Sequence, residues 1–445
     1  METENEIVFD EGVTSENDEV ENLSNRVVHY DPTRPEISTI CENIRKEKIV
    51  TDPDFQRRYV WPNSKATRLI ESILMRIPLP IVYLAESEDG RKRVVIDGQQ
   101  RLQSIYKFRN GDFKLGKMSA FPELTGKKYS ELGEELMERI DTTGIQMITF
   151  SKDCDPELKF NVFERLNTGA MSLNDQELRN CIYRGEYNKF LKELADDADF
   201  RLLLGLKGEE KRMKDVELVL RFAAFYHKSY LNYKSPIKSF LNEDMRLYLH
   251  IGDRDANQLR DAFKKAVSLI KSMLYDGDVS HAFKRFYPGS EGSPDGRWEA
   301  RNFNASLYDI LMWSFARYDK NLVMHNLGAI REAYIDLMTT DNEFIEAIEK
   351  STSSVLMVRK RFKKWDDRME AILHAQDVQP RCFSRELKER LYAQNPVCGI
   401  CRQRIASIDD AAVDHIEQYW LGGQTIDANA RLTHRYCNCA RPRIG

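Results

Sequence analysis

The chain has 445 residues, of which 42% are hydrophobic and 31% are charged. At roughly 150 residues per domain this length predicts about three domains, and the apolar fraction excludes a disordered chain. Asp309 interrupts the most apolar stretch, Leu307 to Phe315, and no run of about 18 apolar residues occurs, which excludes a membrane-spanning protein. The start of the chain lacks the basic and apolar parts of a secretory signal, so we expect a cytoplasmic protein.

Charge is distributed unevenly along the chain, although the net charge of -4 does not by itself indicate nucleic-acid binding. Residues 1–24 hold nine Asp or Glu and no Lys or Arg, which predicts a flexible acidic tail. Shielding of a basic surface is the alternative role for this tail. A basic run from Arg359 to Arg368 is either a surface that contacts phosphates or a solvated helix face.

From about residue 27 to residue 150 the pattern mixes short strands and helices. Short β-like runs predict strands at 81–84, 94–96 and 147–150. Apolar residues at helical spacing predict helices at 64–76 and 99–108.

The segment Asp97-Gly98-Gln99-Gln100-Arg101 follows the second strand and opens a helix, which is a moderate signal for a phosphate site. Glycine permits close backbone approach, helix N-terminal amides favour anions, and an arginine can contact phosphate in a bidentate manner. A turn held by a salt bridge explains the same residues equally well. No GxxxxGK[ST] segment is present, which argues against a P-loop NTPase.

Three further blocks accompany this DGQQR segment in a fixed order: FQRRYVW at 55–61, IPLP at 77–80 and FERLNTG at 163–169. Together, over residues 35–185, they resemble the ParB-like family that forms the N-terminal half of GmrSD-type restriction enzymes. The resemblance implies a ParB/sulfiredoxin-like α+β fold that binds and hydrolyses a nucleoside triphosphate, GTP or ATP. It places Asp97, Gln100 and Arg101 at the phosphates, with Gln56 and Arg57 as neighbours. Asn167, Glu177 and Arg179 are weaker candidates for the phosphate site, since a helix-capping and salt-bridge role is equally plausible for them.

From about residue 158 the chain is predicted to be mostly helical. Apolar stripes at three- and four-residue spacings predict core-facing helices, as in Leu259, Phe263, Val267, Ile270 and Leu274. A long basic helix is expected at 356–373, and residues 288–297 (PGSEGSPDGR) are predicted to form a loop between helices.

Five of the eight cysteines lie in the last 64 residues, where they form part of a metal-ligand pattern. Cys398 and Cys401 form a CxxC pair, and His434 and Cys437 form an HxxC pair. Thiolates and imidazoles suit tetrahedral zinc, which would supply much of the folding energy of so small a region. A redox CxxC is the competing interpretation, but it would need a thioredoxin-like βαβ context that is absent from this pattern.

Between and after these pairs lie Asp414-His415-Ile416, Gly422-Gly423, Asn429 and Asn438. Over residues 383–443 this order resembles the HNH (ββα-metal) endonuclease family. The resemblance implies that His415 is the general base, that Asp414 and Asn438 hold Mg²⁺ or Mn²⁺, and that Asn429 braces the base. Three positions depart from the pattern: His434 replaces a cysteine, Glu417-Gln418 follow Ile416 where a proline is common, and Arg441 replaces a lysine. The alternative for His415 is a further zinc ligand or a core histidine.

The sequence therefore predicts an α+β multidomain protein: an acidic tail (1–24), a ParB-like nucleotide-binding domain (25–185), a helical domain (186–380) and a zinc-stabilised ββα-metal domain (381–445). The predicted function is a nucleotide-responsive, metal-dependent DNA endonuclease that acts in restriction-like defence against phage or modified DNA. Expected partners are DNA and a nucleoside triphosphate but no membrane, and a homo-oligomer is compatible with the sequence. The alternative is a nucleotide-dependent DNA-binding regulator whose zinc module binds DNA without cutting it.

Overall fold

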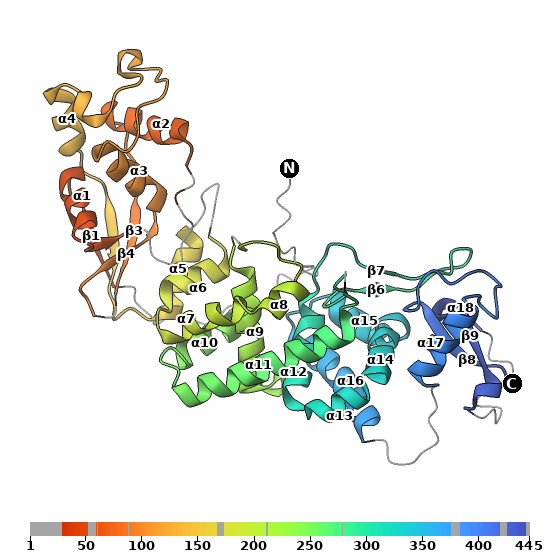
Figure 1. Ribbon diagram of the computed structural model, residues 1–445. Helices are drawn as coiled ribbons and strands as arrows, with labels where there is room; N and C mark the ends of the chain where they lie inside the picture. Colours follow the sequence, from red (N-terminus) through yellow and green to blue (C-terminus); the bar gives the residue numbers. More distant parts are fainter. Residues whose placement is uncertain are drawn as a thin grey trace.

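The computed structural model describes residues 29–51, 59, 61–87, 89–166, 173–210, 212–277, 279–374, 383–418 and 425–441. In these residues the chain forms an α+β region, a helical region and a small C-terminal region, which follow one another in a row in Figure 1. The predicted acidic tail, Gln56, Arg57, Asn167 and the Gly422-Gly423 pair lie outside the described residues.

A five-stranded mixed sheet forms the centre of the N-terminal region, with the strand order β1-β5-β3-β4-β2. Its strands are β1 (Tyr30–Thr33), β2 (Ile49–Val50), β3 (Val82–Glu86), β4 (Arg93–Asp97) and β5 (Met147–Phe150). β3 is antiparallel to β4 and parallel to β5. The three strands predicted from the sequence are confirmed. No pattern predicts β1 or β2, because β1 is exposed and polar and β2 has only two residues.

Helices cover both faces of this sheet, because successive strand residues point to opposite sides. The helices on one face are α1 (Ile37–Arg45), α2 (Asn63–Leu74), α3 (Gln99–Arg109) and α4 (Glu134–Asp141), and they share a core with Val82 and Leu84. On the other face, α5 (Pro156–Leu166) and α6 (Asp175–Ile182) pack against Ala85 and Phe150. The helices predicted at 64–76 and 99–108 are α2 and α3.

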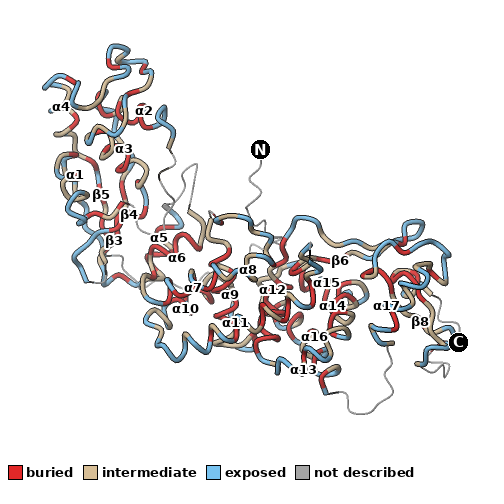
Figure 2. The backbone as a smooth tube through the Cα atoms, viewed as in Figure 1, coloured by how far each residue is buried: buried red, intermediate tan, exposed pale blue. Residues whose placement is uncertain are grey.

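The middle region consists mainly of helices around one large core. Its helices are α7 (Glu186–Ala195), α8 (Ala198–Leu203), α9 (Lys214–Lys228), α10 (Ile237–Leu247), α11 (Asp253–Leu274), α12 (Ala305–Arg317), α13 (Lys320–His325), α14 (Leu327–Thr340), α15 (Asn342–Glu349) and α16 (Val355–Leu373). The predicted α11 stripe is confirmed as core, since each of its five residues is at most 1% exposed. Figure 2 shows buried positions along α11, α12 and α16.

Residues 288–297 connect two short antiparallel strands, β6 (Phe286–Tyr287) and β7 (Arg297–Trp298). This hairpin leaves the helical region and reaches the C-terminal region, as Figure 1 shows. The prediction of a loop is therefore confirmed, but the expectation that this loop joins two helices is wrong, because it connects two short strands. Its role as a bridge between regions depends on tertiary contacts.

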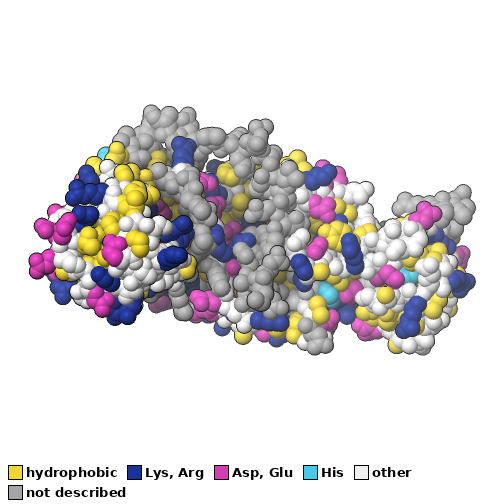
Figure 3. Space-filling model, turned by 90° about the horizontal axis from the view of Figure 1, so that it is seen from above, with side chains coloured by type: hydrophobic (Ala, Val, Ile, Leu, Met, Phe, Trp, Pro, Cys, Tyr) yellow, Lys and Arg dark blue, Asp and Glu magenta, His cyan; other side chains and the backbone are white. Residues whose placement is uncertain are grey.

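The basic run at 359–368 lies on α16, where most of its charges meet carboxylates of the chain. Arg361 is buried against Asp309 of α12, with Nη2 and Oδ2 3.0 Å apart, and Lys364 bonds to Asp341 at 2.8 Å. The run is therefore neither a uniformly solvated face nor a row of free cations. On the face shown in Figure 3, acidic and basic side chains are interspersed over the described residues.

The C-terminal region is small and has little apolar core. It contains α17 (Arg385–Gln394), β8 (Ala411–His415), β9 (Ala430–His434) and α18 (Arg435–Cys439). Its buried apolar cluster consists of Cys398, Ile405, Ala411, Leu432 and Cys437. This region also holds a short 3-10 turn at Asp427–Asn429, and three others occur in the preceding regions at Pro122–Leu124, Tyr129–Glu131 and Tyr230–Asn232. No helix among the described residues combines the length and the hydrophobicity needed to cross a membrane.

Candidate metal centre and adjoining polar site

The two predicted ligand pairs meet in one cluster of three cysteines and a histidine. The ligand atoms of Cys398, Cys401, His434 and Cys437 all lie within 4.8 Å of one another. Nδ1 of His434 is 3.4 Å from Sγ of Cys401 and 3.9 Å from Sγ of Cys437. The first pair lies on the turn before β8, whereas His434 ends β9 and Cys437 lies on α18. The backbone N–H of Gly399 donates to the carbonyl of Leu432 on β9 over 2.7 Å, which places the first pair beside ligands more than thirty residues later in the sequence.

The electrostatics of this cluster fit a bound cation. The backbone N–H groups of Ile400 and His434 each donate to Sγ of Cys398 over 3.4 Å. Burial of Cys398 opposes its thiolate, but backbone donors outweigh it and lower the pKa to about 6. Burial and the neighbouring thiols raise the pKa of Cys437 to about 12. Several thiolates can share so small a space only if a cation neutralises them, and a Cys₃His donor set suits zinc.

The other ring nitrogen of His434 faces two carboxylates that the sequence analysis did not single out. Nε2 lies 3.3 Å from Oδ1 of Asp295, which belongs to the β6–β7 turn. Asp410, just before β8, completes a second group with ligand atoms within 4.8 Å of one another. Burial raises the pKa of Asp410 to about 6. No local sequence signal connects Asp295 to the zinc ligands, because it lies over a hundred residues before them.

Strand pairing separates the cysteine–histidine cluster from Asp414 and His415, whereas Asn438 directly follows the cluster residue Cys437 on α18. In the antiparallel β8–β9 hairpin, Ala411 pairs with His434 and His415 pairs with Ala430. Four residues of extended chain span about 13 Å, so the cluster and His415 lie at opposite ends of one hairpin. α18 follows β9 directly, which gives the order strand, strand, helix.

Asp414 is buried and bonded to two arginines. Its Oδ2 atom accepts from Arg431 Nη2 over 2.6 Å and from Arg441 Nη1 over 2.9 Å. Arg441 also donates to the backbone carbonyl of His415 over 2.7 Å. Arg441 lies three residues after Asn438, so the chain beyond α18 returns to the end of β8 that carries Asp414 and His415. Asn438 itself is partly buried on α18.

His415 and Asn429 lie on adjoining parts of this strand end. Nε2 of His415 is 2.9 Å from Oγ1 of Thr425, and its ring lies 4.4 Å from the ring of Phe383. The Asn429 side chain accepts from the backbone N–H of Glu417 over 2.8 Å and donates to the carbonyl of Glu417 over 3.1 Å. This amide thus fixes the backbone two residues after His415.

In the N-terminal region, the DGQQR segment forms a tight turn between β4 and α3. Gly98 caps α3 with a φ of 97°, a value that favours glycine, and an added Cβ would lie 2.8 Å from Val82. The Arg101 guanidinium bonds to Asp97 over 2.8 Å and to the carbonyl groups of Pro80 and Ile81. The structure therefore contains the salt-bridged turn that was one of the two interpretations.

Gln100 and the weaker candidates also have contacts within the protein. The side-chain oxygen of Gln100 accepts from the backbone N–H of Trp61 over 3.3 Å. Glu177 caps α6 by accepting from the backbone N–H of Asn174 over 2.7 Å. Arg179 is 1% exposed and donates to Asn242 over 2.8 Å. Helix capping and internal hydrogen bonding thus account for Glu177 and Arg179.

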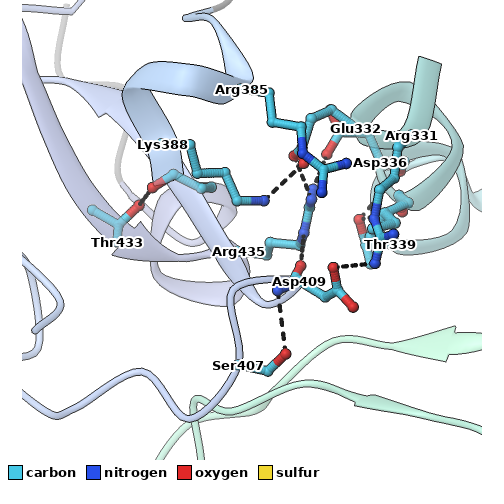
Figure 4. Close-up of polar contacts among 12 residues, drawn as sticks. Arg331, Glu332, Asp336, Thr339, Arg385, Lys388, Ser407, Asp409, Thr433 and Arg435 are labelled. Atoms are coloured by element: carbon cyan, nitrogen blue, oxygen red, sulfur yellow. Dashed lines mark hydrogen bonds and ion pairs between the residues drawn. The ribbon is translucent and has the colours of Figure 1, made fainter. Parts of the chain in front are cut away.

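Charged side chains join the C-terminal region to α14 of the helical region, as Figure 4 shows. Arg435 follows the cluster residue His434 and donates to Asp336 over 2.6 Å and to Glu332. Lys388 of α17 donates to Glu332 over 2.7 Å, and Asp409 pairs with Arg331. No local sequence pattern points to these residues, because isolated charges carry no information about distant partners.

A comparison with known families identifies the N-terminal region. Residues 37–184 match the family model described as the N-terminal domain of GmrSD restriction endonucleases. No curated protein matches the chain. The matched segment begins with α1 and ends just after α6, which is one third of the chain, and it agrees with the resemblance inferred over residues 35–185.

Proposed function

We propose that this chain, whose N-terminal match supports a GmrSD-type restriction protein, is a metal-dependent DNA endonuclease that cuts with its C-terminal region. The observation that carries the proposal is the β8–β9 hairpin, with a zinc-type cluster at one end and His415 at the other. The order β8, β9, α18 agrees with the ββα-metal motif that the sequence resembles. Phage DNA or modified DNA is the proposed substrate.

The chemistry required is the hydrolysis of a phosphodiester bond. Such a reaction needs a base that takes a proton from water and positive charge close to the phosphate. We assign the base role to His415, because an imidazole can be neutral near pH 7. Asn429 holds the backbone after it. Mg²⁺ or Mn²⁺, held by Asp414 and Asn438, would supply positive charge at the phosphate.

The contacts of Asp414 favour a second candidate function. Arg431 and Arg441 both bond to its Oδ2 atom, so they compete with a cation for that oxygen. The same two guanidinium groups place positive charge where a DNA phosphate could bind. This arrangement suits a nucleotide-dependent DNA-binding regulator, which would bind DNA without cutting it.

The N-terminal region is proposed to bind GTP or ATP at the turn before α3. Support comes from the tight turn at Gly98, the helix N-terminus behind it and the family match. Arg101 is bonded to backbone carbonyl groups, so its first role is to hold this turn in place. Asp97, Gly98, Gln99 and Gln100 complete the proposed phosphate site, and nucleotide binding would regulate the nuclease.

The test is DNA cleavage by the full chain with Mg²⁺ or Mn²⁺, with modified and unmodified phage DNA, and with or without GTP and ATP. Wild type should cut at least one DNA, and His415→Ala should lose cleavage while keeping its zinc content and melting temperature. His325→Ala, which changes an exposed histidine of α13, is the matched control and should cut like wild type. DNA binding with no cleavage by wild type under any of these conditions would favour the regulator.

A further inference from the structure

Two carboxylates from different regions converge on the ring nitrogen of His434 that faces away from the cysteines. Nε2 lies 3.3 Å from Oδ1 of Asp295, and the ligand atoms of Asp295, Asp410 and His434 lie within 4.8 Å of one another. His434 and Asp410 are fully buried. Among the described residues, neither Nε2 of His434 nor the two carboxylate oxygens of Asp410 have a hydrogen bond of good geometry, although Asp295 lies beside Nε2 and the Gly296 N–H lies beside Asp410.

Buried polar atoms without partners are costly, so this arrangement needs an explanation. Nδ1 of His434 is directed at Cys401 and Cys437, which leaves Nε2 as the nitrogen that carries the proton when Nδ1 binds a metal. Histidine ligands almost always donate that remaining N–H to a carboxylate or carbonyl group, which orients the ring and strengthens the ligand. Asp295 and Asp410 are placed to accept it.

We propose that Asp295 and Asp410 position His434 for zinc, and that Asp295 makes zinc binding depend on the docking of the C-terminal region against the helical region. The proposal rests on the Cys₃His site being a zinc site. It adds the inference that one of the orienting carboxylates comes from outside the zinc-binding region.

The β6–β7 turn is shaped for this contact. Oδ1 of Asp295 also accepts from the backbone N–H of Ala406 over 3.0 Å, so one carboxylate contacts both His434 and the segment before β8. A Cβ atom on Gly296 would lie 2.6 Å from Oδ1 of Asp410 and 2.7 Å from the Phe286 ring. Glycine at this position therefore permits the close approach of the turn to the cluster.

The charged contacts beside the cluster hold the C-terminal region and the helical region in one fixed position relative to each other. Arg435 is 3% exposed and donates to Asp336 of α14 and to the carbonyl of Asp409, both over 2.6 Å. Asp409 in turn accepts from Trp298 of β7 over 3.0 Å. A buried polar network of this kind disfavours alternative docking geometries. It keeps the β6–β7 turn, and with it Asp295, next to His434.

The experiment measures zinc stoichiometry and affinity of the full chain by competition with a colorimetric chelator. Asp295→Asn and Asp410→Asn should each bind zinc about 10- to 100-fold more weakly, which is the usual effect of losing such a carboxylate. Gly296→Ala should also weaken binding, although it leaves every ligand and carboxylate in the chain. Glu291→Gln, which removes an exposed charge from the same turn, is the matched control and should bind zinc within twofold of wild type.

The outcomes separate this inference from the zinc site itself. Circular dichroism identifies any variant that fails to fold, and Asp295→Asn should fold because its side chain is 44% exposed. If wild type binds zinc and Asp295→Asn and Asp410→Asn bind it with the same affinity, this inference is overturned and the zinc site itself stands. Wild type could instead bind two zinc ions per chain, and Asp410→Asn could lose one of them without weakening the other. That result would assign the carboxylates to a second ion and would also overturn this inference. A wild-type chain that binds no zinc overturns both proposals.

Discussion

Oγ1 of Thr425 lies 2.9 Å from Nε2 of His415, although Thr425 comes ten residues after His415 in the chain. The ring of Phe383 contacts the same imidazole at a centroid distance of 4.4 Å. A side chain held from two sides in this way has a restricted orientation, which is a requirement for a general base. The hydroxyl of Thr425 also influences which tautomer the imidazole adopts, because it bonds to Nε2.

Replacing the hydroxyl should therefore affect cleavage and leave the fold intact. We expect Thr425→Val to cut DNA about fivefold more slowly, since one net hydrogen bond is worth about 1 kcal/mol. Thr425→Ser, which retains the hydroxyl, should cut at close to the wild-type rate. The measurement is the single-turnover cleavage rate with zinc content as a check. Equal rates for the valine and serine variants would contradict the role of this contact.

Loss of one cysteine ligand should unfold the C-terminal region. Its buried apolar cluster contains only five residues, whereas structural zinc contributes on the order of 10 kcal/mol in isolated peptides. We expect Cys398→Ser to lose zinc and to expose residues 383–441 to limited proteolysis. Cys439→Ser, which changes an exposed thiol outside the cluster, is the matched control and should keep both zinc and protease resistance. Zinc retention by Cys398→Ser would refute the ligand assignment.

The helical core depends on a buried aspartate between two arginines. Asp309 of α12 accepts from Nε of Arg221 and from Nη2 of Arg361, each over 3.0 Å. Asp309→Asn would leave two buried guanidinium groups without their counter-charge, so we expect a loss of about 3–5 kcal/mol in the free energy of unfolding. Asp367→Asn, whose partner Lys363 is exposed, should cost less than about 1 kcal/mol in the same urea titration. Similar losses in the two variants would show that burial of Asp309 is unimportant.

Stability should fall as the pH rises from about 4.5 to about 7, in part because of Glu210. Burial raises the pKa of this carboxyl from 4.5 to about 7, although two backbone N–H groups donate hydrogen bonds to it. Between these values the folded chain binds more protons than the unfolded chain, so the free energy of unfolding decreases with rising pH. The melting temperature of Glu210→Gln should therefore rise relative to that of wild type as the pH increases. Glu209→Gln, an exposed neighbour, should follow wild type, and a parallel curve for Glu210→Gln would contradict the assignment.

Local sequence patterns determined much of the fold and the metal cluster. The α11 stripe and the bounds of β5 follow from apolar periodicity, which acts over a few residues. The ligand pairs Cys398–Cys401 and His434–Cys437 were also visible, because zinc requires thiolates and imidazole at short spacings. The DGQQR segment and the three blocks that accompany it led to the family that the comparison then supported.

Tertiary structure alone decided which groups face those local features. Asp295 meets His434, Arg361 meets Asp309, and Arg101 meets carbonyl groups before β3 only after distant segments pack together. A charge in a sequence carries no record of its partner, since an ion pair depends on position in space and not on neighbouring residues. For that reason the sequence showed a basic run and a turn. In the folded chain most of the basic side chains of α16 meet carboxylates, and a carboxylate of the turn reaches the metal cluster from another region.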